Sequence, residues 1–451
     1  MPTLEQQIAE QLIFKTNDNV FIHGKAGTGK SYFLNQIIKP QAAAYGKKPV
    51  FLASTGLAAK NISGRTLHSF LYLHSFDGNL IIIDEISMVR ADLLDKLDEK
   101  LRILKQNNQV FGGVQMVFVG DLYQLPPVVR MSEPNKKKAF KNPFPQTAAD
   151  LSAYRGRKIQ KYDSQFFLSA NCIRQTYLHI VDFTKVYRQE NLNFLDLLNK
   201  VRTADLDAAS LAQINGRLLP AGAKIPDTDM YLSATNKVAD TYNEKRLLEQ
   251  SKQTGQPVYT IRAQNYPANI DENLIPPTPE ELKICVGARV MMTKNGPKNG
   301  NGVQAYVNGD IGTVKKIKKS EDGYIIEVYL NRGATVYLTM VMFDIKEELF
   351  NNNTGEIYER CVAKFAQIPL RLAWALTIHK SQGQTFNSIV LDLGDEGAFE
   401  SGQTYVALSR CRTIEGVNLT KMLAAASVKT EKDIIEKLIE TQKKVNKFIR
   451  P

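Results

Sequence analysis

A glycine-rich run at residues 24–31 reads GKAGTGKS and fits the P-loop pattern G-x-x-x-x-G-K-[ST]. Its glycines allow backbone N–H groups to curl around an anion, and the start of a helix adds the positive end of its dipole. Lys30 can reach the β- and γ-phosphates of ATP, and Ser31 can coordinate Mg²⁺. The residues expected to bind the nucleotide are Gly24, Ala26, Gly27, Thr28, Gly29, Lys30 and Ser31.

Two adjacent carboxylates end a later apolar run, which reads IIIDE at residues 81–85. Asp84 suits the coordination of Mg²⁺, directly or through water, and Glu85 can orient and deprotonate an attacking water. A second acid beside the first distinguishes an NTP hydrolase from most NTP kinases, which need no activated water. A helix-capping Asp-Glu pair is the alternative, but the position of the pair after the P-loop favours hydrolysis.

Three further side chains could act on the same phosphates. Gln124 lies in the run GDLYQLPPV at residues 120–128 and can hydrogen-bond both a γ-phosphate and a water. Arg188 and Arg410 lie in the second half of the chain, where a guanidinium could stabilise transition-state charge and link domain closure to the nucleotide. Each arginine could instead form a surface ion pair.

The elements that must position these residues have the pattern of an α/β protein. In the first third, short apolar runs alternate with helical stretches, which is typical of a parallel sheet whose ligands bind at the carboxyl ends of the strands. The expected strands cover residues 19–23, 50–53, 80–83 and 115–119. This pattern predicts a first domain over residues 1–130, followed by an irregular basic linker or insertion at 131–170.

A second α/β pattern begins near residue 171 and predicts a domain formed by residues 171–255 and 362–430. Its expected strands are 229–234, 388–392 and 417–419, and its expected helices are 192–202 and 237–250. Short β-prone runs at 288–292, 311–317, 324–330 and 334–338 indicate a small β-barrel inserted at 256–361. A Lys/Glu-rich helix is expected within residues 431–451.

Composition limits the partners. The 451 residues carry a formal net charge of +12, and ten basic against three acidic residues lie between Arg130 and Arg174. Such a surplus favours an anionic partner such as nucleic acid, although a basic tract can also be a solvated loop. No run approaches the roughly 18 apolar residues that span a bilayer, so we expect no membrane partner. The N-terminus has no secretory pattern, and the four cysteines lie far apart, as free thiols in a reducing compartment do.

Together these segments resemble the Pif-type DNA helicases, in the branch of helicase superfamily 1 that also holds RecD-like and Dda-like enzymes. The resemblance runs in order from about residue 4 to about residue 417. It includes IDEISMV at 83–89, FGGVQ at 111–115, GDLYQLPPV at 120–128, HKSQGQT at 379–385 and YVALSR at 405–410. Gln7 resembles the adenine-reading glutamine upstream of the P-loop. Val110 is a departure, because the family usually has proline there.

The resemblance implies two RecA-like motor domains with ATP between them, and 5′→3′ translocation on single-stranded DNA. It also implies a wedge at about residues 64–79, in which Tyr72, His74 and Phe76 could pack in the core or stack at a fork. An SH3-like module is implied within 256–361, and its tight turn matches VNGDIG at 307–312. Hydroxyls, basic groups and ring faces can grip a strand without reading its sequence. The expected DNA-binding residues are Ser54, Thr55, His68, Phe70, Asn308, Thr377, His379, Lys380 and Ser381.

The function expected from these features is an ATP-dependent 5′→3′ DNA helicase that acts on single strands and duplex junctions as a monomer. A translocase that strips proteins or remodels RNA–DNA hybrids is one alternative, and an ATP-switched single-strand binding protein is another. The lack of long terminal extensions favours a cytoplasmic protein of a prokaryote or phage, associated with the nucleoid, over a nuclear or mitochondrial one.

The salt dependence of single-strand binding tests whether the basic tract contacts phosphates. Each phosphate contact on a single strand contributes a slope of about 0.7 to the decrease of log affinity with log salt. Neutralising Lys136, Lys137 and Lys138 together should reduce that slope by about two units if all three contact phosphates, as measured by single-strand binding over a salt series. An unchanged slope would identify the tract as a solvated loop.

Overall fold

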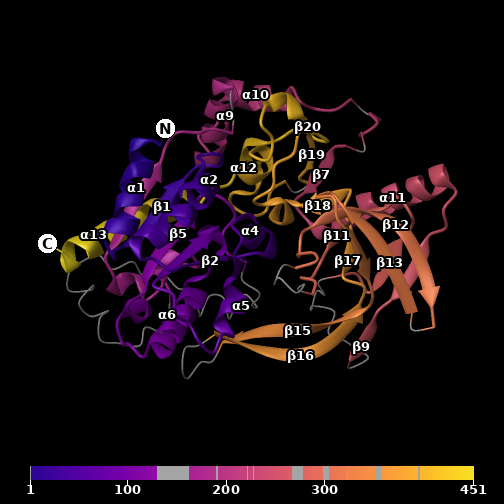
Figure 1. The fold of residues 1–451 in the computed structure, drawn as a ribbon. Helices are drawn as coiled ribbons and strands as arrows, with labels where there is room; N and C mark the ends of the chain where they lie inside the picture. Colours follow the sequence, from indigo (N-terminus) through magenta and orange to yellow (C-terminus); the bar gives the residue numbers. More distant parts are fainter. Residues whose placement is uncertain are drawn as a thin grey trace.

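Six parallel strands form the first sheet, in the order β3-β2-β4-β5-β1-β6 (Figure 1). Their bounds are β1 Asn19–Gly24, β2 Pro49–Ala53, β3 Arg65–Thr66, β4 Leu80–Asp84, β5 Gln115–Gly120 and β6 Leu178–Phe183. The central strands β4 and β5 are buried at every position because helices cover both faces, so they read as unbroken apolar runs. The computed structural model describes residues 2–128, 162–188, 191–220, 222–226, 228–266, 278–297, 304–321, 323–350, 357–394 and 397–450.

The first domain extends further along the chain than the predicted boundaries allow. Strand β6 pairs with β1 along its whole length, so the boundary predicted at residue 171 is wrong. β6 is an edge strand with an irregular burial pattern, which left no continuous apolar run to recognise. Phe166 and Phe167 are also in the first core, and Arg174 is buried in an ion pair with Asp163. Residues 131–161, the rest of the predicted linker, lie outside the described residues.

Helices complete this domain: α1 Leu4–Lys15, α2 Lys30–Tyr32, α4 Gly56–Asn61, α5 Leu67–Leu71, α6 Ala91–Lys105 and α13 Lys432–Ile449. The predicted C-terminal helix is confirmed as α13, and it packs on the first domain. Its Ile435 and Leu438 belong to the core that surrounds α6, and Asn446 exchanges hydrogen bonds with both backbone groups of Leu178, at 3.0 and 2.7 Å.

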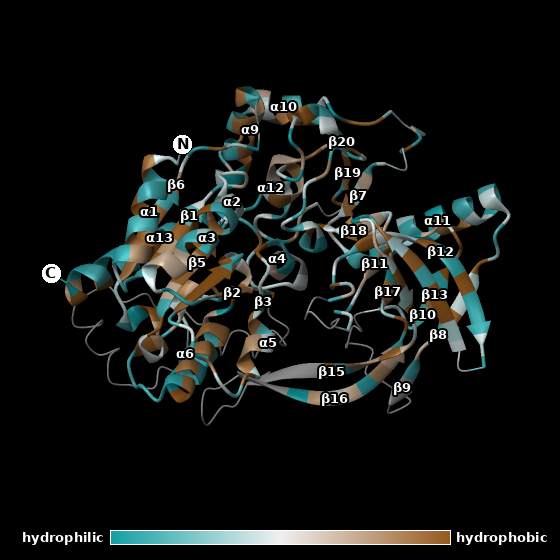
Figure 2. Ribbon diagram, viewed as in Figure 1, coloured by the Kyte–Doolittle hydropathy of each residue, from teal (hydrophilic) through white to brown (hydrophobic). Residues whose placement is uncertain are grey.

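A second parallel sheet has the order β18-β7-β19-β20, with β7 Met230–Ser233, β18 Ala375–Thr377, β19 Ile389–Asp392 and β20 Val417–Leu419. The three predicted strands are confirmed as β7, β19 and β20, and the three-residue β18 was not predicted. The helices of this domain are α9 Leu192–Thr203, α10 Ala208–Asn215, α11 Asn236–Thr254 and α12 Gln403–Leu408. Figure 2 shows α11 as hydrophilic along most of its length and β2 of the first sheet as hydrophobic.

The inserted β-rich segment consists of antiparallel strands. Its main sheet has the order β14-β13-β12-β11-β17, with β11 Arg289–Met292, β12 Ile311–Ser320, β13 Gly323–Leu330, β14 Thr335–Leu338 and β17 Leu370–Leu372. The four predicted strands are confirmed, but β17 lies beyond the expected end at residue 361. Strands β8 Tyr259–Arg262 and β10 Glu281–Ile284 form a pair. Strands β15 Val341–Phe350 and β16 Ile357–Gln367 form a long hairpin that runs toward α5 in Figure 1. The short strand β9 Gln264–Tyr266 pairs with β16.

The structure distinguishes packing in the core from exposure at a fork for the aromatic residues between α5 and β4. Phe76 packs against Phe70 with ring centroids 5.3 Å apart, and Lys105 lies over its ring, so Phe76 is a partly buried residue that packs against the first core. Tyr72 is 68% exposed and His74 is also exposed, which leaves both able to meet a ligand. Among the described helices, none is long and apolar enough to cross a membrane.

The packing of α13 predicts that it stabilises the first domain. Leu438→Ala removes a buried side chain from the α6 core, so the free energy of unfolding should fall by about 2–5 kcal/mol. Lys443→Ala on the exposed face of the same helix is the control and should change it by under about 0.5 kcal/mol. Denaturant unfolding measures both. Equal effects of the two substitutions would contradict the placement of α13 in the core.

Candidate nucleotide site and nucleic-acid interface

The P-loop joins β1 to α2, as the pattern predicted. Gly27 and Gly29 have φ angles of 83° and 78°, a left-handed conformation that favours glycine. A Cβ on Gly24 would lie 2.8 Å from Thr28 Oγ1 and 2.9 Å from the Phe183 carbonyl oxygen, so no larger residue fits there. The glycines therefore set both the curl of the loop and its close packing against β6.

Lys30 points into the loop and donates to the carbonyl oxygens of Gly24 and Lys25, at 2.6 and 2.9 Å. Burial lowers the pKa of its ammonium, while the carboxylates of Asp121 and Glu85 oppose that shift. An ammonium held by carbonyl dipoles at the mouth of a loop of amides is suited to exchange those dipoles for phosphate oxygens.

Asp84 and Ser31 lie where a divalent cation would bind. Asp84 is buried at the end of β4, and its Oδ1 accepts from the Glu85 backbone N–H at 2.9 Å. Burial and the neighbouring Glu85 raise the pKa of Asp84 to about 7, although a hydrogen bond from Ser31 opposes this. Two carboxylates beside a hydroxyl fit Mg²⁺, which binds one or two carboxylates and completes its shell with water and substrate phosphates.

Glu85 takes a left-handed conformation, with φ 51° and ψ 47°, that a residue other than glycine rarely adopts. Its Oε2 accepts from Gln382 Nε2 at 3.3 Å, and the same amide donates to Gln124 Oε1 at 3.3 Å. Gln382 comes from the second domain, so this amide connects both predicted water-handling residues of the first domain to the second. Gln382 lies in the run HKSQGQT at residues 379–385, and no role was predicted for it.

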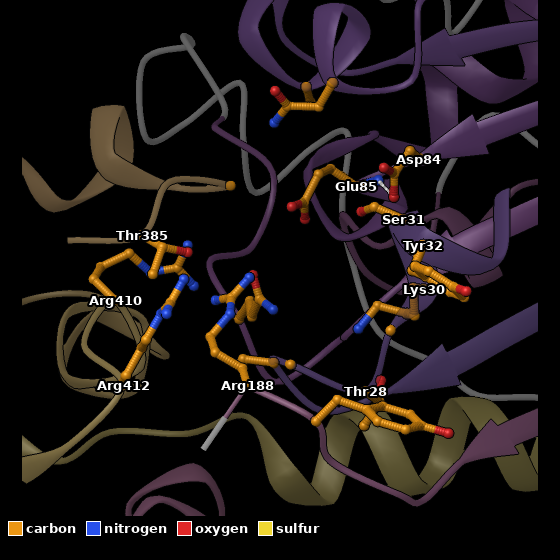
Figure 3. A pocket seen from close by; sticks show the side chains of 18 of the residues that line it. Thr28, Lys30, Ser31, Tyr32, Asp84, Glu85, Arg188, Thr385, Arg410 and Arg412 are labelled. Carbon is orange, nitrogen blue, oxygen red and sulfur yellow. Dashed lines mark hydrogen bonds between the residues drawn. The ribbon is translucent and has the colours of Figure 1, made fainter. Parts of the chain in front are cut away.

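Arginines of the second half face these groups across one pocket (Figure 3). Lys30, Ser31, Asp84 and Glu85 line one side, and Arg188, Arg410 and Arg412 line the other. Arg410 is buried and donates to the carbonyl oxygens of Val406 and Gln384, at 2.8 and 3.0 Å. Burial and the nearby Arg188 lower the pKa of Arg410 to about 10. Neither Arg188 nor Arg410 is therefore a solvated surface arginine.

Arg412 was missed, although it lies only two residues after Arg410 in the sequence. The two upstream glutamines differ in their distance from the P-loop. Gln7 is exposed and donates to the Pro2 carbonyl oxygen, whereas Gln6 is buried and lies close to Gly29 of the P-loop. Tyr187 lies beside Gly29 as well, and its N–H donates to the Gly27 carbonyl oxygen at 2.8 Å. One helical position separates the two glutamines, and the N-terminal capping box that fixes Gln6 was not recognised.

Of the expected DNA-binding residues, several lie at the surface near the contact between the domains. Thr55 caps α4, and a Cβ on the adjacent Gly56 would lie 3.3 Å from Asn295 Oδ1 and 3.4 Å from Asn308 Cβ. Asn308 and His68 are exposed. His379 pairs with Glu400 at 2.7 Å, and Lys380 donates to Asn236 at 3.4 Å. Both side chains are partly exposed, and both partners belong to the second domain.

Other expected DNA-binding residues are buried. Phe70 is fully buried against Phe76, so its ring cannot stack on a base. Ser381 is fully buried and donates to the Ile378 carbonyl oxygen at 2.7 Å, and Thr377 is buried at the end of β18. The side chains of Phe70, Ser381 and Thr377 therefore belong to the protein interior. Ser54 Oγ is buried and has no hydrogen-bond partner among the residues that the structure describes.

Comparison with known proteins identifies the relatives of this chain. A family model described as PIF1-like helicase matches residues 3–78 and 74–149. The ATP-dependent DNA helicase Pif1 of Psychrobacter sp. is 30% identical, over 91% of this chain and 67% of the relative. The chain spans about three fifths of the length of the first curated relatives that it matches, between 58% and 64%.

Solved structures of Pif1 proteins are also similar to this chain. The crystal structure of Bacteroides Pif1 bound to ssDNA is 30% identical, covers 99% of this chain and 98% of its own, and superposes with a TM-score of 0.76. Unliganded Pif1 from Bacteroides sp. is 31% identical and covers 97% and 96%, but the TM-score is 0.58. The chain belongs to the family of PIF1-like helicases.

Proposed function

We propose that this protein is an ATP-dependent DNA helicase that moves 5′→3′ along single-stranded DNA and unwinds duplex structures. The observation that carries the proposal is the two-sided pocket. Its P-loop and carboxylates come from the first parallel sheet, and its arginines come from the second domain and the segment that leads to it. Hydrolysis at such a pocket changes the charge that holds two domains together, which is what a motor requires.

The first domain supplies the chemistry of hydrolysis. The P-loop amides and Lys30 bind the phosphates, and Gln6, in place of Gln7, faces the adenine end beside Tyr187. Mg²⁺ held by Ser31 and Asp84 would neutralise phosphate charge when bound. Glu85 accepts the proton of the attacking water, while Gln124 orients that water or the γ-phosphate.

The second half supplies the charge that is needed during transfer. Arg188 and Arg410 lie close enough for the first to lower the pKa of the second, a repulsion that bound phosphates would relieve. A guanidinium that approaches the γ-phosphate stabilises the transition state more than the ground state. We infer that closure of the two domains on ATP brings these arginines into their working positions.

Relatives support the DNA partner. The Pif1 structure with ssDNA superposes better on this chain than the unliganded one, with TM-scores of 0.76 and 0.58. We propose that the strand crosses both domains along Thr55, His68 and Asn308 and continues past His379 and Lys380. In this proposal the two parallel sheets are RecA-like, Tyr72 and His74 belong to a wedge, and the inserted sheet is SH3-like.

The alternative is a single-strand binding protein that uses ATP only as a switch. Multiple turnovers stimulated by single strands, together with duplex opening, would favour the motor. Tight binding without turnover would favour the switch. The contact of Gln382 with both Glu85 and Gln124 favours the motor, because a strand-facing motif of the second domain then touches the hydrolytic residues directly.

Substitution of the proposed base tests the hydrolysis mechanism. Glu85→Gln should bind ATP as the wild type does and hydrolyse it about 10²–10⁴-fold more slowly, since an amide can hold a water but cannot accept its proton. Steady-state phosphate release in the presence of single-stranded DNA measures the rate, and nucleotide titration measures binding. Glu440→Gln on the exposed part of α13 is the matched control. A loss of less than about fivefold would show that Glu85 is not the base.

Duplexes that carry a single tail test the polarity. With equal enzyme, ATP and Mg²⁺, a duplex with a 5′ single-stranded tail should be opened and one with a 3′ tail should not. Strand separation is read on a gel or by fluorescence, and Lys30→Ala, which lacks the phosphate-binding ammonium, gives the background. Preferential opening of the 3′-tailed duplex would contradict the proposed direction while leaving the ATPase assignment intact.

A further inference from the structure

A cluster of buried charged and polar residues lies directly behind the nucleotide pocket, where the two domains meet. Its centre is Asp121, which follows β5 and is fully buried. Arg202 of α9 donates to Asp121 Oδ1 at 2.8 Å through Nη2 and also through Nε, and its guanidinium lies 3.9 Å from the centre of the Tyr123 ring. His23 of β1 lies 3.5 Å from the same carboxylate and 2.8 Å from Asp182.

Tyr405 of α12 connects this cluster to the P-loop. Its buried hydroxyl accepts a hydrogen bond from the backbone N–H of Ala26 at 2.9 Å and lies 3.1 Å from Asp121 Oδ2, to which it donates. One hydroxyl of the second domain therefore forms two hydrogen bonds with the first domain, one with a P-loop amide and one with a carboxylate. Tyr405 does not line the pocket, so it has no direct contact with the space for the nucleotide.

The charge of Asp121 fixes the direction of these hydrogen bonds. Burial alone would raise its pKa, but Arg202 and His23 outweigh burial and hold the pKa of Asp121 far below its usual range. Burial and the nearby Asp121 raise the pKa of the Tyr405 hydroxyl. The carboxylate therefore stays ionised and the hydroxyl stays protonated, so Tyr405 is the donor toward Asp121 and the acceptor toward Ala26.

Helix α12 is held at its start and carries the arginines at its end. A Cβ on Gly402, the residue before the helix, would lie 2.6 Å from the Gln124 carbonyl oxygen, so the helix start rests against the segment that holds Gln124. At the other end, Arg410 Nε donates to the Val406 carbonyl oxygen at 2.8 Å and Nη2 donates to Ser409 Oγ at 3.0 Å. The position of α12 therefore sets the position of the Arg410 guanidinium.

We propose that Tyr405 is a positioning residue for ATP hydrolysis, which holds α12, and through it Arg410, in register with the P-loop. The inference rests on the proposed function. Asp121 orients the hydroxyl, Arg202 keeps Asp121 ionised, and the Ala26 N–H receives the hydroxyl as its partner. When the domains separate, both hydrogen bonds break together, so Arg410 leaves the pocket with α12.

Tyr405→Phe tests this role because it removes the hydroxyl and keeps the ring. The kcat of single-strand-stimulated ATP hydrolysis should fall about 10-fold, since Arg410 acts on the transition state, while the KM for ATP stays within about twofold. Tyr231→Phe is the matched control. Tyr231 is also buried, and its hydroxyl donates to Asp392, which lies in the same second domain. The kcat of Tyr231→Phe should therefore remain at the wild-type value.

A second measurement does not depend on turnover. Hydrogen exchange of the backbone amides in residues 403–409, followed without nucleotide, should be faster in Tyr405→Phe than in the wild type and unchanged in Tyr231→Phe. Wild-type kcat in Tyr405→Phe, equal losses in both variants, or unaltered exchange would each overturn the proposal. A wild-type protein that fails to hydrolyse ATP would refute the proposed function instead, and the exchange result would still decide whether Tyr405 holds α12.

Discussion

Unbalanced positive charge at the domain boundary is the constraint on which the site depends. Lys30, Arg188, Arg410 and Arg412 line one pocket with two carboxylates, Asp84 and Glu85. Lys30 is satisfied by carbonyl oxygens, and Arg410 is held by carbonyl oxygens and a hydroxyl. Such neutral acceptors orient the cations without cancelling their charge. In the proposed mechanism, ATP with its Mg²⁺ supplies the negative charge that these cations lack, so nucleotide state and domain closure depend on the same electrostatic balance.

The chain meets this constraint with two parallel sheets, because the carboxyl ends of parallel strands bring loops to one edge. The residues at the ends of β1, β4 and β5 could be predicted, since those strands are buried on both faces and read as unbroken apolar runs that end in polar residues. Asp84, Glu85 and Gln124 were predicted as candidates from their positions after such strands, and the P-loop was predicted from its motif in the same context. Arg188 and Arg410 were identified as candidates, but sequence physics could not separate them from surface arginines, because burial depends on contacts with the other domain.

The misplaced residues show where local pattern is insufficient. Gln6 and Gln7 have the same chemistry, and only the direction of the α1 face, which places Gln6 near Gly29 of the P-loop, favours the proposal of Gln6 over Gln7. Phe70 was expected to stack on a base, yet an aromatic residue on a short helix is equally able to fill the core, and its contact with Phe76 decides the matter. Edge strand β6 and the terminal helix α13 join the first domain through contacts distant in sequence, which no local window reveals.

Contacts between domains also occur away from the nucleotide. Lys60 of α4 binds Asp310 at 2.5 Å, and Asp310 follows the turn that contains Asn308, next to Gly56. Asp310 is nearly buried and also lies 3.4 Å from Arg332, so its charge is held by cations from both sides. The first domain thus contacts α12 of the second domain, and its own helix α4 contacts the inserted sheet. We propose that movement of the domains at the pocket is accompanied by movement at this second contact, where the DNA strand is proposed to bind. In this proposal, a hydrolysis step that changes the charge in the pocket alters the grip on DNA without any direct contact between the two ligands.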